Sequence, residues 1–440
     1  MLLPSTRRPG KGNGYALRET VHSKPCPSSA NDSRARQKNE RHRNNRGNGT
    51  SATKLLSLLV LAVVTLLLVY SSKVPHLYTP EFTAEHRTAQ EQRHPQAQQQ
   101  QTQDLSETYR RPEDTKLPRA SSPFLDKLAT CDSLDCLRET HMLPRGAAKF
   151  NHPHFLIIGF QKAATTSLYS YLARHNETLA SSLKEPEFFV NGCGSKVPEG
   201  CSRNATVKYL HSTLRSWIYL DWNGTKGSFE GSTHIVREGI ELAPRLLRMM
   251  PWLKLIVNLR EPISRAASML IHNEDRNGMG CLSRKDMGTC LLYASQITKP
   301  SDGGPATYYD ALYPWVNTWP ANQLMVIQYE ELTQDEERER DELTRVKTYL
   351  GLDLSWPKAE GLELRNARRF KINADGWKVP REQYLKLVEI ARSDMIRLLA
   401  LLGSKQLVND RAWAERWERV WEETLETCPT DGAECTMVLS

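Results

Sequence analysis

Short apolar runs that alternate with helical patterns constrain the fold of this 440-residue chain more than any other feature. Such runs are typical of buried strands, and a strand, a loop and a helix repeated in this order indicate an α/β fold with a parallel sheet flanked by helices. The expected strands are 154–160 (HFLIIGF), 254–259 (KLIVNL) and 324–328 (LMVIQ), and the expected helices are 166–174, a segment beginning just after Pro262, 335–350, 381–402 and 410–427. Because ligands bind at the carboxyl ends of parallel strands, the loops at 160–166 and 260–264 are the expected places for a site.

A long uncharged stretch precedes this pattern. Residues 55–72 (LLSLLVLAVVTLLLVYSS) are 18 uncharged positions between Lys54 and Lys73, and as a helix they would span roughly 27 Å, which suits a thin bilayer. A cleaved signal peptide would rarely follow so long a leader, and a core helix would show a polar face. We therefore predict a single transmembrane signal-anchor helix. Its arginine-rich flank should stay cytosolic, which makes the chain a type II membrane protein with its later residues in the lumen.

The positive charge of the chain lies before this stretch. The chain has 59 Lys+Arg and 51 Asp+Glu, of which residues 1–54 hold 12 and 3. The remainder is nearly neutral, so no nucleic-acid partner is expected. Residues 73–130 are Gln/Pro-rich and too polar to bury a core. The expected organisation is a basic cytosolic tail (1–54), the signal-anchor (55–72), a disordered stem (73–130) and a luminal domain (131–440).

The cysteines agree with this topology. Cys26 falls on the predicted cytosolic side, and eight cysteines follow the apolar stretch as four close couples. An even number in an oxidising compartment favours disulfides, although eight cysteines allow 105 pairings. No CxxC motif occurs and no histidine stands at ligand spacing, so no metal is expected. The couples are Cys131 and Cys136, Cys193 and Cys201, Cys281 and Cys290, and Cys428 and Cys435; the candidate N-glycosylation sites are Asn176, Asn204 and Asn223.

The first expected strand leads into a helix through residues 159–167 (GFQKAATTS). A loop in this position aims backbone N–H groups and the positive end of the helix at an anion, and Lys162 adds a cation. The loop is P-loop-like but departs from a Walker A motif, because Ala163 follows the lysine and the hydroxyl groups begin only at Thr165. An ordinary strand-to-helix turn is the simplest alternative reading.

The second expected strand leads into residues 260–268 (REPISRAAS). Pro262 suits the start of a helix, Arg260 stands at the strand tip, and Ser268 lies two turns into the helix. Arg260 and Ser268 can converge on one phosphate, the arginine through its bidentate guanidinium. Arg265 is expected to be a solvated helix residue.

The two loops together resemble the 5′-phosphosulfate and 3′-phosphate loops of the sulfotransferases that use 3′-phosphoadenosine 5′-phosphosulfate (PAPS). The resemblance covers about 153–403 and includes the stretch 308–332 (YYDALYPWVNTWPANQLMVIQYEEL). With the signal-anchor and stem included, the chain resembles Golgi carbohydrate sulfotransferases, most of all the heparan-sulfate branch. The resemblance implies that 131–440 is a catalytic domain with PAPS as co-substrate and no metal.

By motif position, the resemblance also implies the site residues. One departure is Ala164, where the family loop usually has glycine; a methyl group there crowds the backbone's approach to the phosphate. The 5′-phosphosulfate would be held by Lys162, Ala163, Ala164, Thr165, Thr166 and Ser167, and the 3′-phosphate by Arg260 and Ser268.

Residues 184–189 (KEPEFF) carry the candidate base. A Lys–Glu pair of this kind is often only a solvated surface pair. In heparan-type enzymes, however, a glutamate three residues before a Phe–Phe pair acts as the catalytic base, and Glu185 has that spacing whereas Glu187 does not. The family often has a lysine in the segment that corresponds to 230–233, where this chain has Gly231 or Ser232. The acceptor contact of that lysine must come from elsewhere, or the acceptor differs.

The implied reaction moves a sulfuryl group from PAPS to a hydroxyl or amine of a glycan or proteoglycan in the Golgi lumen. Transfer would be in line, with Lys162 stabilising the charge on the departing phosphate and Glu185 acting as general base. A luminal P-loop-type kinase and an inactive membrane-tethered glycan-binding protein of the same fold are the alternatives. A tyrosylprotein sulfotransferase is also luminal and anchored, but the glutamate before Phe–Phe favours a sugar acceptor.

Other polar and aromatic residues give weaker signals. A lone histidine is more often structural than catalytic, and of four candidates the two that flank the site loops are the better ones. A basic cluster near the carboxyl third could close over the nucleotide, grip an acidic glycan or be a plain basic loop, and three tryptophans at helical spacing predict an apolar helix face. These residues are His152, His154, His234 and His272; Arg365, Arg368, Arg369 and Lys371 before Gly376, Trp377 and Lys378; and Trp413, Trp417 and Trp421.

Overall fold

The computed structural model describes the carboxyl-terminal part of the chain. The predicted tail, signal-anchor (55–72) and stem up to residue 122 lie outside the described residues, so they stay predictions. Within the described ranges, every helix is too short or too polar to cross a bilayer. The ranges are 123–146, 148–214, 224–277, 281–296, 304–333, 335–356, 361–363, 376–429 and 434–440.

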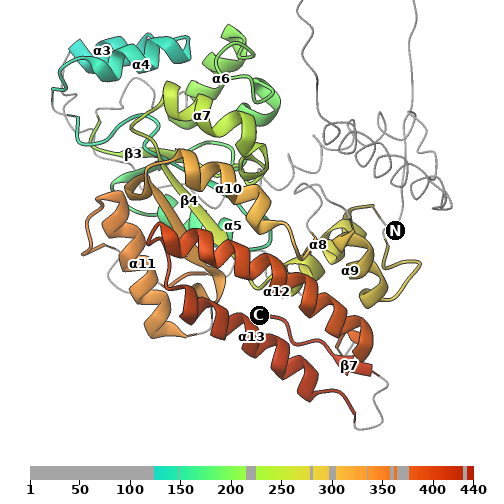
Figure 1. The fold of residues 1–440 in the computed structure, drawn as a ribbon. Helices are drawn as coiled ribbons and strands as arrows, with labels where there is room; N and C mark the ends of the chain where they lie inside the picture. Colours follow the sequence, from blue (N-terminus) through green and yellow to red (C-terminus); the bar gives the residue numbers. More distant parts are fainter. Residues whose placement is uncertain are drawn as a thin grey trace, which may run out of the picture. The chain divides into compact units, whose positions relative to one another are not determined.

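A five-stranded parallel sheet forms the centre of this part (Figure 1). Its order is β2-β3-β1-β4-β5, so β1 lies in the middle between β3 and β4. The three expected strands are all present, which confirms the predicted α/β class. Two strands were not predicted, because they are short and contain Gly, Ser, Thr or Glu instead of an apolar run. The strands are β1 (Phe155–Gly159), β2 (Thr178–Ala180), β3 (Gly227–Glu230), β4 (Lys254–Leu259) and β5 (Leu324–Gln328).

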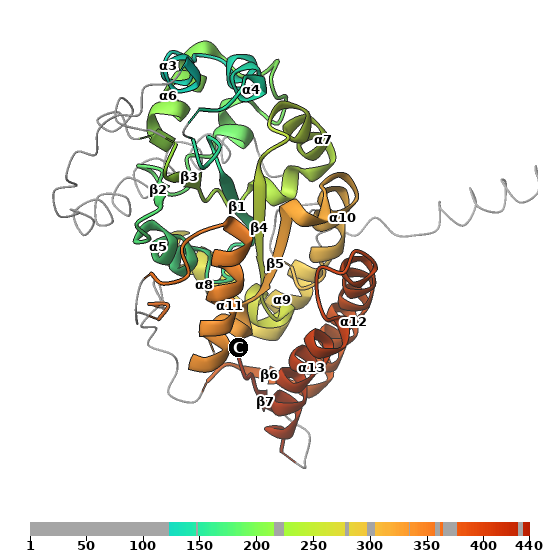
Figure 2. The ribbon, with the colours of Figure 1, turned by 90° about the vertical axis from the view of Figure 1, so that its left-hand side faces the viewer.

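Helices cover both faces of the sheet (Figure 2). Alternate residues of β1 point to opposite faces, so Ile157 belongs to one hydrophobic cluster and Ile158 to the other. The strands are buried on both sides, which explains why they read as continuous apolar runs in the sequence. One face packs against α5 (Thr165–Ala173) and α11 (Glu336–Leu350), and the other against α7 (Gly239–Met249), α10 (Tyr308–Thr318) and α12 (Arg381–Ser404).

The predicted helices form at or within two residues of their expected bounds. The helix α8 (Pro262–Asn277) begins at its proline, as expected from the fixed φ of that residue. The helix α11 begins after Asp335, whose side chain accepts the N–H groups of Glu337 and Arg338, and ends at Gly351, which has a φ of 74°. The helix α13 (Asp410–Glu426) lies beside α12.

The folded part begins before the expected boundary at residue 131. The helix α3 (Pro123–Ala129) buries Phe124, Leu125 and Leu128 in the main hydrophobic cluster, so residues 123–130 belong to the domain and not to the stem. Composition misled here, because the apolar residues of this short helix follow a long polar segment. The remaining elements are α4 (Leu134–Met142), the π-helical η1 (Phe188–Gly192), α6 (Arg203–Leu214), the 3-10 helices η3 (Ile235–Glu238), η5 (Ala321–Gln323) and η6 (Tyr329–Leu332), α9 (Met287–Ser295), and the antiparallel strands β6 (Lys378–Pro380) and β7 (Glu434–Thr436).

Four disulfides join the four close couples of cysteines and resolve the pairing that the sequence left open. Each bridge closes a local loop instead of joining distant elements, and the last one joins the end of α13 to β7. The pairs are Cys131–Cys136, Cys193–Cys201, Cys281–Cys290 and Cys428–Cys435.

The tryptophans of α13 form a buried face, as their spacing predicted, but two of them also donate hydrogen bonds. Trp421 Nε1 donates to Glu261 Oε1 at 2.6 Å, and Trp417 Nε1 donates to Glu330 Oε2 at 3.2 Å. The Glu261 carboxyl group also accepts the N–H groups of Ile263 and Ser264 in the first turn of α8. The helix α13 therefore supports the loop that follows β4 through polar contacts as well as apolar packing.

We expect Trp421→Phe to lower the free energy of unfolding by about 1–3 kcal/mol, because it leaves a buried carboxyl oxygen without one of its donors. Denaturant unfolding of the variant and the wild type measures the difference. Trp413→Phe is the matched control, since the Trp413 indole donates no hydrogen bond to a described residue. Equal losses in the two variants would show that the Trp421 hydrogen bond contributes nothing.

Candidate active site

The candidate site lies at the carboxyl ends of β3, β1 and β4. In this strand order the chain runs from β1 to one side of the sheet and later returns to the other, so the edge beside β1 is a topological switch point. The segments that follow the three strands are 160–164, 231–238 and 260–264. Two of these segments were predicted to carry the site.

The loop after β1 has the backbone that an anion site needs. The helix α5 begins at Thr165, so the first N–H groups of its first turn point into the loop beside Lys162. Lys162 and Ala164 have φ values of 68° and 58°, in the left-handed region that favours glycine. The usual glycine at the position of Ala164 in related loops thus has a physical reason, and this chain holds the same turn with a methyl group present. The hydroxyl groups of Thr165, Thr166 and Ser167 lie in that first turn.

The two predicted loops are in direct contact. Arg260 Nη1 donates to the Lys162 carbonyl oxygen at 3.3 Å, and the Asn258 amide donates to the Ala163 carbonyl oxygen at 3.1 Å. The Arg260 guanidinium also lies over the Tyr329 ring, 4.4 Å from its centroid. These contacts bring the candidate ligands of both phosphates to one place.

The carboxyl-terminal segment reaches the same arginine, which nothing in the sequence indicated. Arg260 Nε donates to Ser440 Oγ at 3.3 Å, Arg260 Nη2 donates to the Ser440 carbonyl oxygen, and the Ser440 N–H donates to Ser264 Oγ at 3.1 Å. Upstream, the Val438 N–H donates to Thr424 Oγ1, which holds the segment along α13. Ser264 is thus the serine beside this segment, while the predicted Ser268 lies half-buried further along α8.

Arg265 is buried, with 1% of its surface exposed, so its expected position as a solvated residue is wrong. Its Nη2 donates to the Gly304 carbonyl oxygen and to Thr307 Oγ1, both at 2.9 Å, and its guanidinium lies 4.8 Å from the Tyr308 ring centroid. Tyr308 Oη in turn donates to the Arg260 carbonyl oxygen at 2.8 Å. The Arg265 guanidinium packs on Tyr308, and Tyr308 holds the backbone of the loop after β4.

The Lys184–Glu185 pair lies in the site and not on an open surface. The two side chains form an ion pair in which Lys184 is only 9% exposed, and Thr233 Oγ1 donates to Glu185 Oε1 at 3.3 Å. Burial works to raise the pKa of the Glu185 carboxyl, but Lys184, with help from His234 and Thr233, holds it below its ordinary value. Glu185 is therefore a carboxylate at neutral pH.

Glu230, the last residue of β3, is a second acidic group that the sequence did not single out. It is fully buried, and burial raises its pKa to about 8. Ser232 Oγ donates to Glu230 Oε2 at 2.6 Å and accepts the Glu187 N–H at 3.0 Å. Ser232 thus joins two acidic segments, and either it or Gly231 occupies the place expected for the family's lysine.

The histidines divide into structural and site residues. His152 and His154 lie at the amino end of β1, where Nδ1 of the first is 2.5 Å from Ser228 Oγ and Nε2 of the second is 2.9 Å from the Leu350 carbonyl oxygen. Burial lowers their pKa values to about 3 and about 4, so both are neutral. His234 alone of these three lies among the site segments, with Nδ1 2.7 Å from Glu187 Oε1.

Several predicted features fall outside the site or outside the described residues. Asn176 and Asn204 are exposed, whereas Asn223 and the basic cluster at 365–371 are not described. In the ranges that the structure describes, no three His, Cys, Asp or Glu side chains are grouped to hold a metal.

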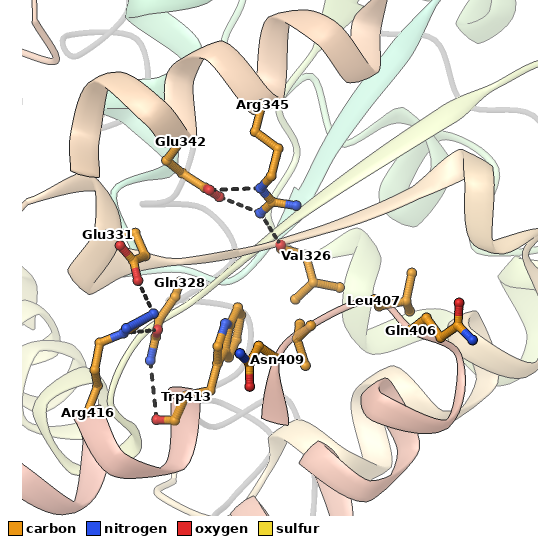
Figure 3. A pocket seen from close by; sticks show the side chains of 11 residues that line it. Val326, Gln328, Glu331, Glu342, Arg345, Gln406, Leu407, Asn409, Trp413 and Arg416 are labelled. Atoms are coloured by element: carbon orange, nitrogen blue, oxygen red, sulfur yellow. Dashed lines mark hydrogen bonds and ion pairs between the residues drawn. The ribbon is translucent and has the colours of Figure 1, made fainter. Parts of the chain in front are cut away.

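A cavity of about 360 Å³ lies between β5, α11 and α13 (Figure 3). Its two guanidinium groups are already paired, Arg345 with Glu342 and Arg416 with Glu331. Its other lining residues include Val326, Gln328, Leu407 and Trp413. The cavity contains none of the residues predicted to bind PAPS.

The geometry thus places two loops with candidate anion ligands at adjacent strand ends, with a paired carboxylate beside them. A family model for the sulfotransferase domain matches residues 152–374, which is just over half of the chain, and the chain therefore belongs to that family. Family membership makes it a sulfotransferase that takes its sulfuryl group from PAPS.

Two solved structures are similar to this chain. A sulfotransferase from Alicyclobacillus acidocaldarius is 19% identical with a TM-score of 0.41, and the match covers 59% of this chain and 97% of that one. The sulfotransferase domain of the Synechococcus PCC 7002 olefin synthase is 13% identical with a TM-score of 0.32, and the match covers 57% and 97%. No curated protein matches the chain.

The wild type should become less stable as the pH rises, and we expect Glu230→Gln to make this fall in stability smaller. The folded protein binds the Glu230 proton more tightly than the unfolded chain does, because the pKa rises from an ordinary 4.5 to about 8. The stabilising effect of this proton is complete below the ordinary pKa and is lost as the pH rises through the folded-state value. Glutamine mimics the protonated acid and cannot ionise.

Thermal unfolding at about pH 5 and about pH 8 measures this effect. The variant should lose less Tm between the two than the wild type, whereas the exposed control Glu382→Gln should behave as the wild type does. If the Tm of Glu230→Gln falls between the two pH values by as much as that of the wild type, Glu230 does not hold a proton in the folded protein.

Proposed function

We propose that this enzyme transfers the sulfuryl group of PAPS to a hydroxyl or amine of a glycan or proteoglycan in the Golgi lumen. The observation that carries the site is the hydrogen bond from Arg260 to the Lys162 carbonyl oxygen, which joins the two phosphate loops across β1 and β4. The Glu185 segment reaches the same loop through His234, which contacts Glu187 on one side and Gln161 on the other. These contacts support a single site built from the three segments.

The loop residues have the chemistry that PAPS needs. Lys162 and the N–H groups of the first turn of α5 would hold the 5′-phosphosulfate, with Thr165, Thr166 and Ser167 as hydroxyl donors. Arg260, already oriented by Tyr329 and the Lys162 carbonyl oxygen, would hold the 3′-phosphate with Ser268. Bound PAPS supplies an activated sulfuryl group, so Lys162 has only to stabilise the negative charge that builds on the leaving phosphate.

Glu185 would accept the proton of the acceptor. Its pKa below the ordinary range keeps it ionised, and Lys184 and Thr233 fix its direction. Phe188 and Phe189 anchor the segment, since the Phe188 ring stacks on the Tyr209 ring with centroids 4.3 Å apart. This anchoring gives a physical reason for the spacing of a glutamate before a Phe–Phe pair.

A carbohydrate acceptor and a Golgi address are supported by separate features. The spacing of Glu185 from Phe188 is the one that the resemblance connects with sugar acceptors. Four disulfides, the apolar stretch at 55–72 and the exposed Asn176 and Asn204 support a luminal domain on a type II anchor. Transfer from labelled PAPS to a panel of defined oligosaccharides tests the acceptor, and glycan binding without transfer would favour an inactive relative of the same fold.

We expect Lys162→Ala to reduce sulfuryl transfer by about 10²-fold or more, because it removes the cation that faces the leaving phosphate. Release of 3′-phosphoadenosine 5′-phosphate (PAP) measures the rate. The exposed Lys386→Ala on α12 is the control and should keep wild-type activity. Normal transfer by Lys162→Ala would remove the loop after β1 from the mechanism.

Glu185→Gln should lower kcat by about 10²- to 10⁴-fold and leave the affinity for PAP nearly unchanged, because the carboxylate acts on the acceptor. Steady-state kinetics and calorimetric titration with PAP separate the two quantities. The exposed Glu199→Gln serves as the control. A loss of PAP binding with an unchanged kcat would assign Glu185 to the nucleotide instead.

A further inference from the structure

We propose that Gln161 is a positioning residue that couples the phosphosulfate loop to the segment of the general base. Its side chain is the centre of a row of four hydrogen-bonding groups, Arg237, Gln161, His234 and Glu187, which we call the Gln161 relay. The inference rests on the proposed function, because it assigns a role within that site.

The relay is continuous from Arg237 to Glu187. Arg237 Nη2 donates to Gln161 Oε1 at 2.8 Å. Gln161 Nε2 lies 2.9 Å from His234 Nε2, and His234 Nδ1 lies 2.7 Å from Glu187 Oε1. Each contact has the length of a good hydrogen bond.

The chemistry of the end groups fixes the direction of every proton. A guanidinium can only donate, so the Gln161 atom that faces Arg237 is the amide oxygen. The amide nitrogen then faces His234 and can also only donate, so His234 Nε2 accepts. The imidazole is therefore neutral with its proton on Nδ1, which donates to Glu187. The row runs from a cation to a carboxylate with all its dipoles aligned, an arrangement that strengthens each bond.

Close packing lets η3 lie against the loop. A Cβ on Gly159 would lie 2.6 Å from Val236 Cγ1, so the end of β1 must be glycine for this approach. The approach places Arg237 and His234 within reach of Gln161.

Two members of the relay lie next to the two proposed reacting groups in the sequence. Gln161 directly precedes Lys162, and Glu187 follows Glu185 by two residues. Glu187 has a φ of 53° and a side chain only 7% exposed, so it has little freedom to adjust if its partner moves. The relay thus fixes Lys162 relative to Glu185, as an in-line transfer between them requires.

The relay has one protonation state. The charged groups that face His234 are Glu187 through Nδ1, Glu185 through space and Arg237 through Gln161. A second proton on the imidazole would set its Nε2–H against the Gln161 NH₂ group, two donors facing each other. Acid therefore breaks the contact between the loop and His234.

Two variants at Gln161 test the relay in the full chain. Gln161→Met keeps the size of the side chain but makes no hydrogen bond, and it should lower kcat by about ten- to a hundredfold with little change in the KM for PAPS. Gln161→Glu keeps the bond to Arg237 but turns a second acceptor toward His234 Nε2, so it is satisfied only by the doubly protonated imidazole. The ratio of its activity to that of the wild type should therefore increase as the pH is lowered from about 8 to about 6.

A readout without an acceptor keeps this test separate from the proposed function. In the ¹⁵N-histidine-labelled chain, with the signal assigned by its loss in His234→Asn, Gln161→Glu should move the titration midpoint of His234 upward. The control Gln323→Met, at an amide that donates to the Pro251 carbonyl oxygen, should leave rate and midpoint unchanged. If no acceptor in the panel is sulfated, the proposed function fails. The His234 titration in the wild type and in Gln161→Glu still tests the relay, because it needs no acceptor. An unchanged His234 midpoint, or a pH profile of Gln161→Glu parallel to the wild type, would overturn the relay.

Discussion

The contact of the Arg260 guanidinium with the Lys162 carbonyl oxygen is the interaction on which the rest of the site depends. It works because β1 and β4 are neighbours in the sheet, so the chain segments that leave them meet at one edge. Arg260 keeps its direction through the ring of Tyr329 and through Tyr308, which donates to its carbonyl oxygen. The helix α13 adds a second layer of support, since Trp421 holds the first turn of α8.

Three glutamates in the segments after β2 and at the end of β3 differ in protonation or in partner because their surroundings differ. Glu185 has an ammonium partner and stays ionised, whereas Glu230 has a hydroxyl partner and full burial, which keep its proton in place at neutral pH. Glu187 is bound by the imidazole of His234. Equal residue types within one small region thus provide an ionised carboxylate, a neutral acid and a hydrogen-bonded anchor, a division that is common where carboxyl groups cluster.

The sequence predicted what hydrophobic patterning can encode. The strands β1, β4 and β5 are buried on both faces, so they are apolar throughout, and Pro262 marks the start of α8. The strand β3 escaped notice because its four residues include Gly, Ser and Glu, although all four are buried. Glu230 was missed for the same reason: its burial depends on the neighbouring strands, which no local window of sequence reveals.

The sequence also did not predict which partners the charged side chains would have in the folded protein. Arg265 resembles a solvated helix residue until the turn at Gly304 and Thr307 covers it. The motif spacing predicted that the loop after β1 and the Glu185 segment lie at one edge of the sheet. The hydrogen bonds that connect the two depend on His234, just before η3, and on Arg237 within it. Long-range contacts of this kind follow from topology and not from spacing along the chain.

The contact of Ser440 with Arg260 occupies two of the donors that the guanidinium would offer an anion. Any anion that pairs with Arg260 Nε and Nη2 must therefore displace Ser440 or share these donors with it. Displacement would also break the hydrogen bond from the Ser440 N–H to Ser264 Oγ, so occupancy of this arginine and the position of residues 438–440 are linked.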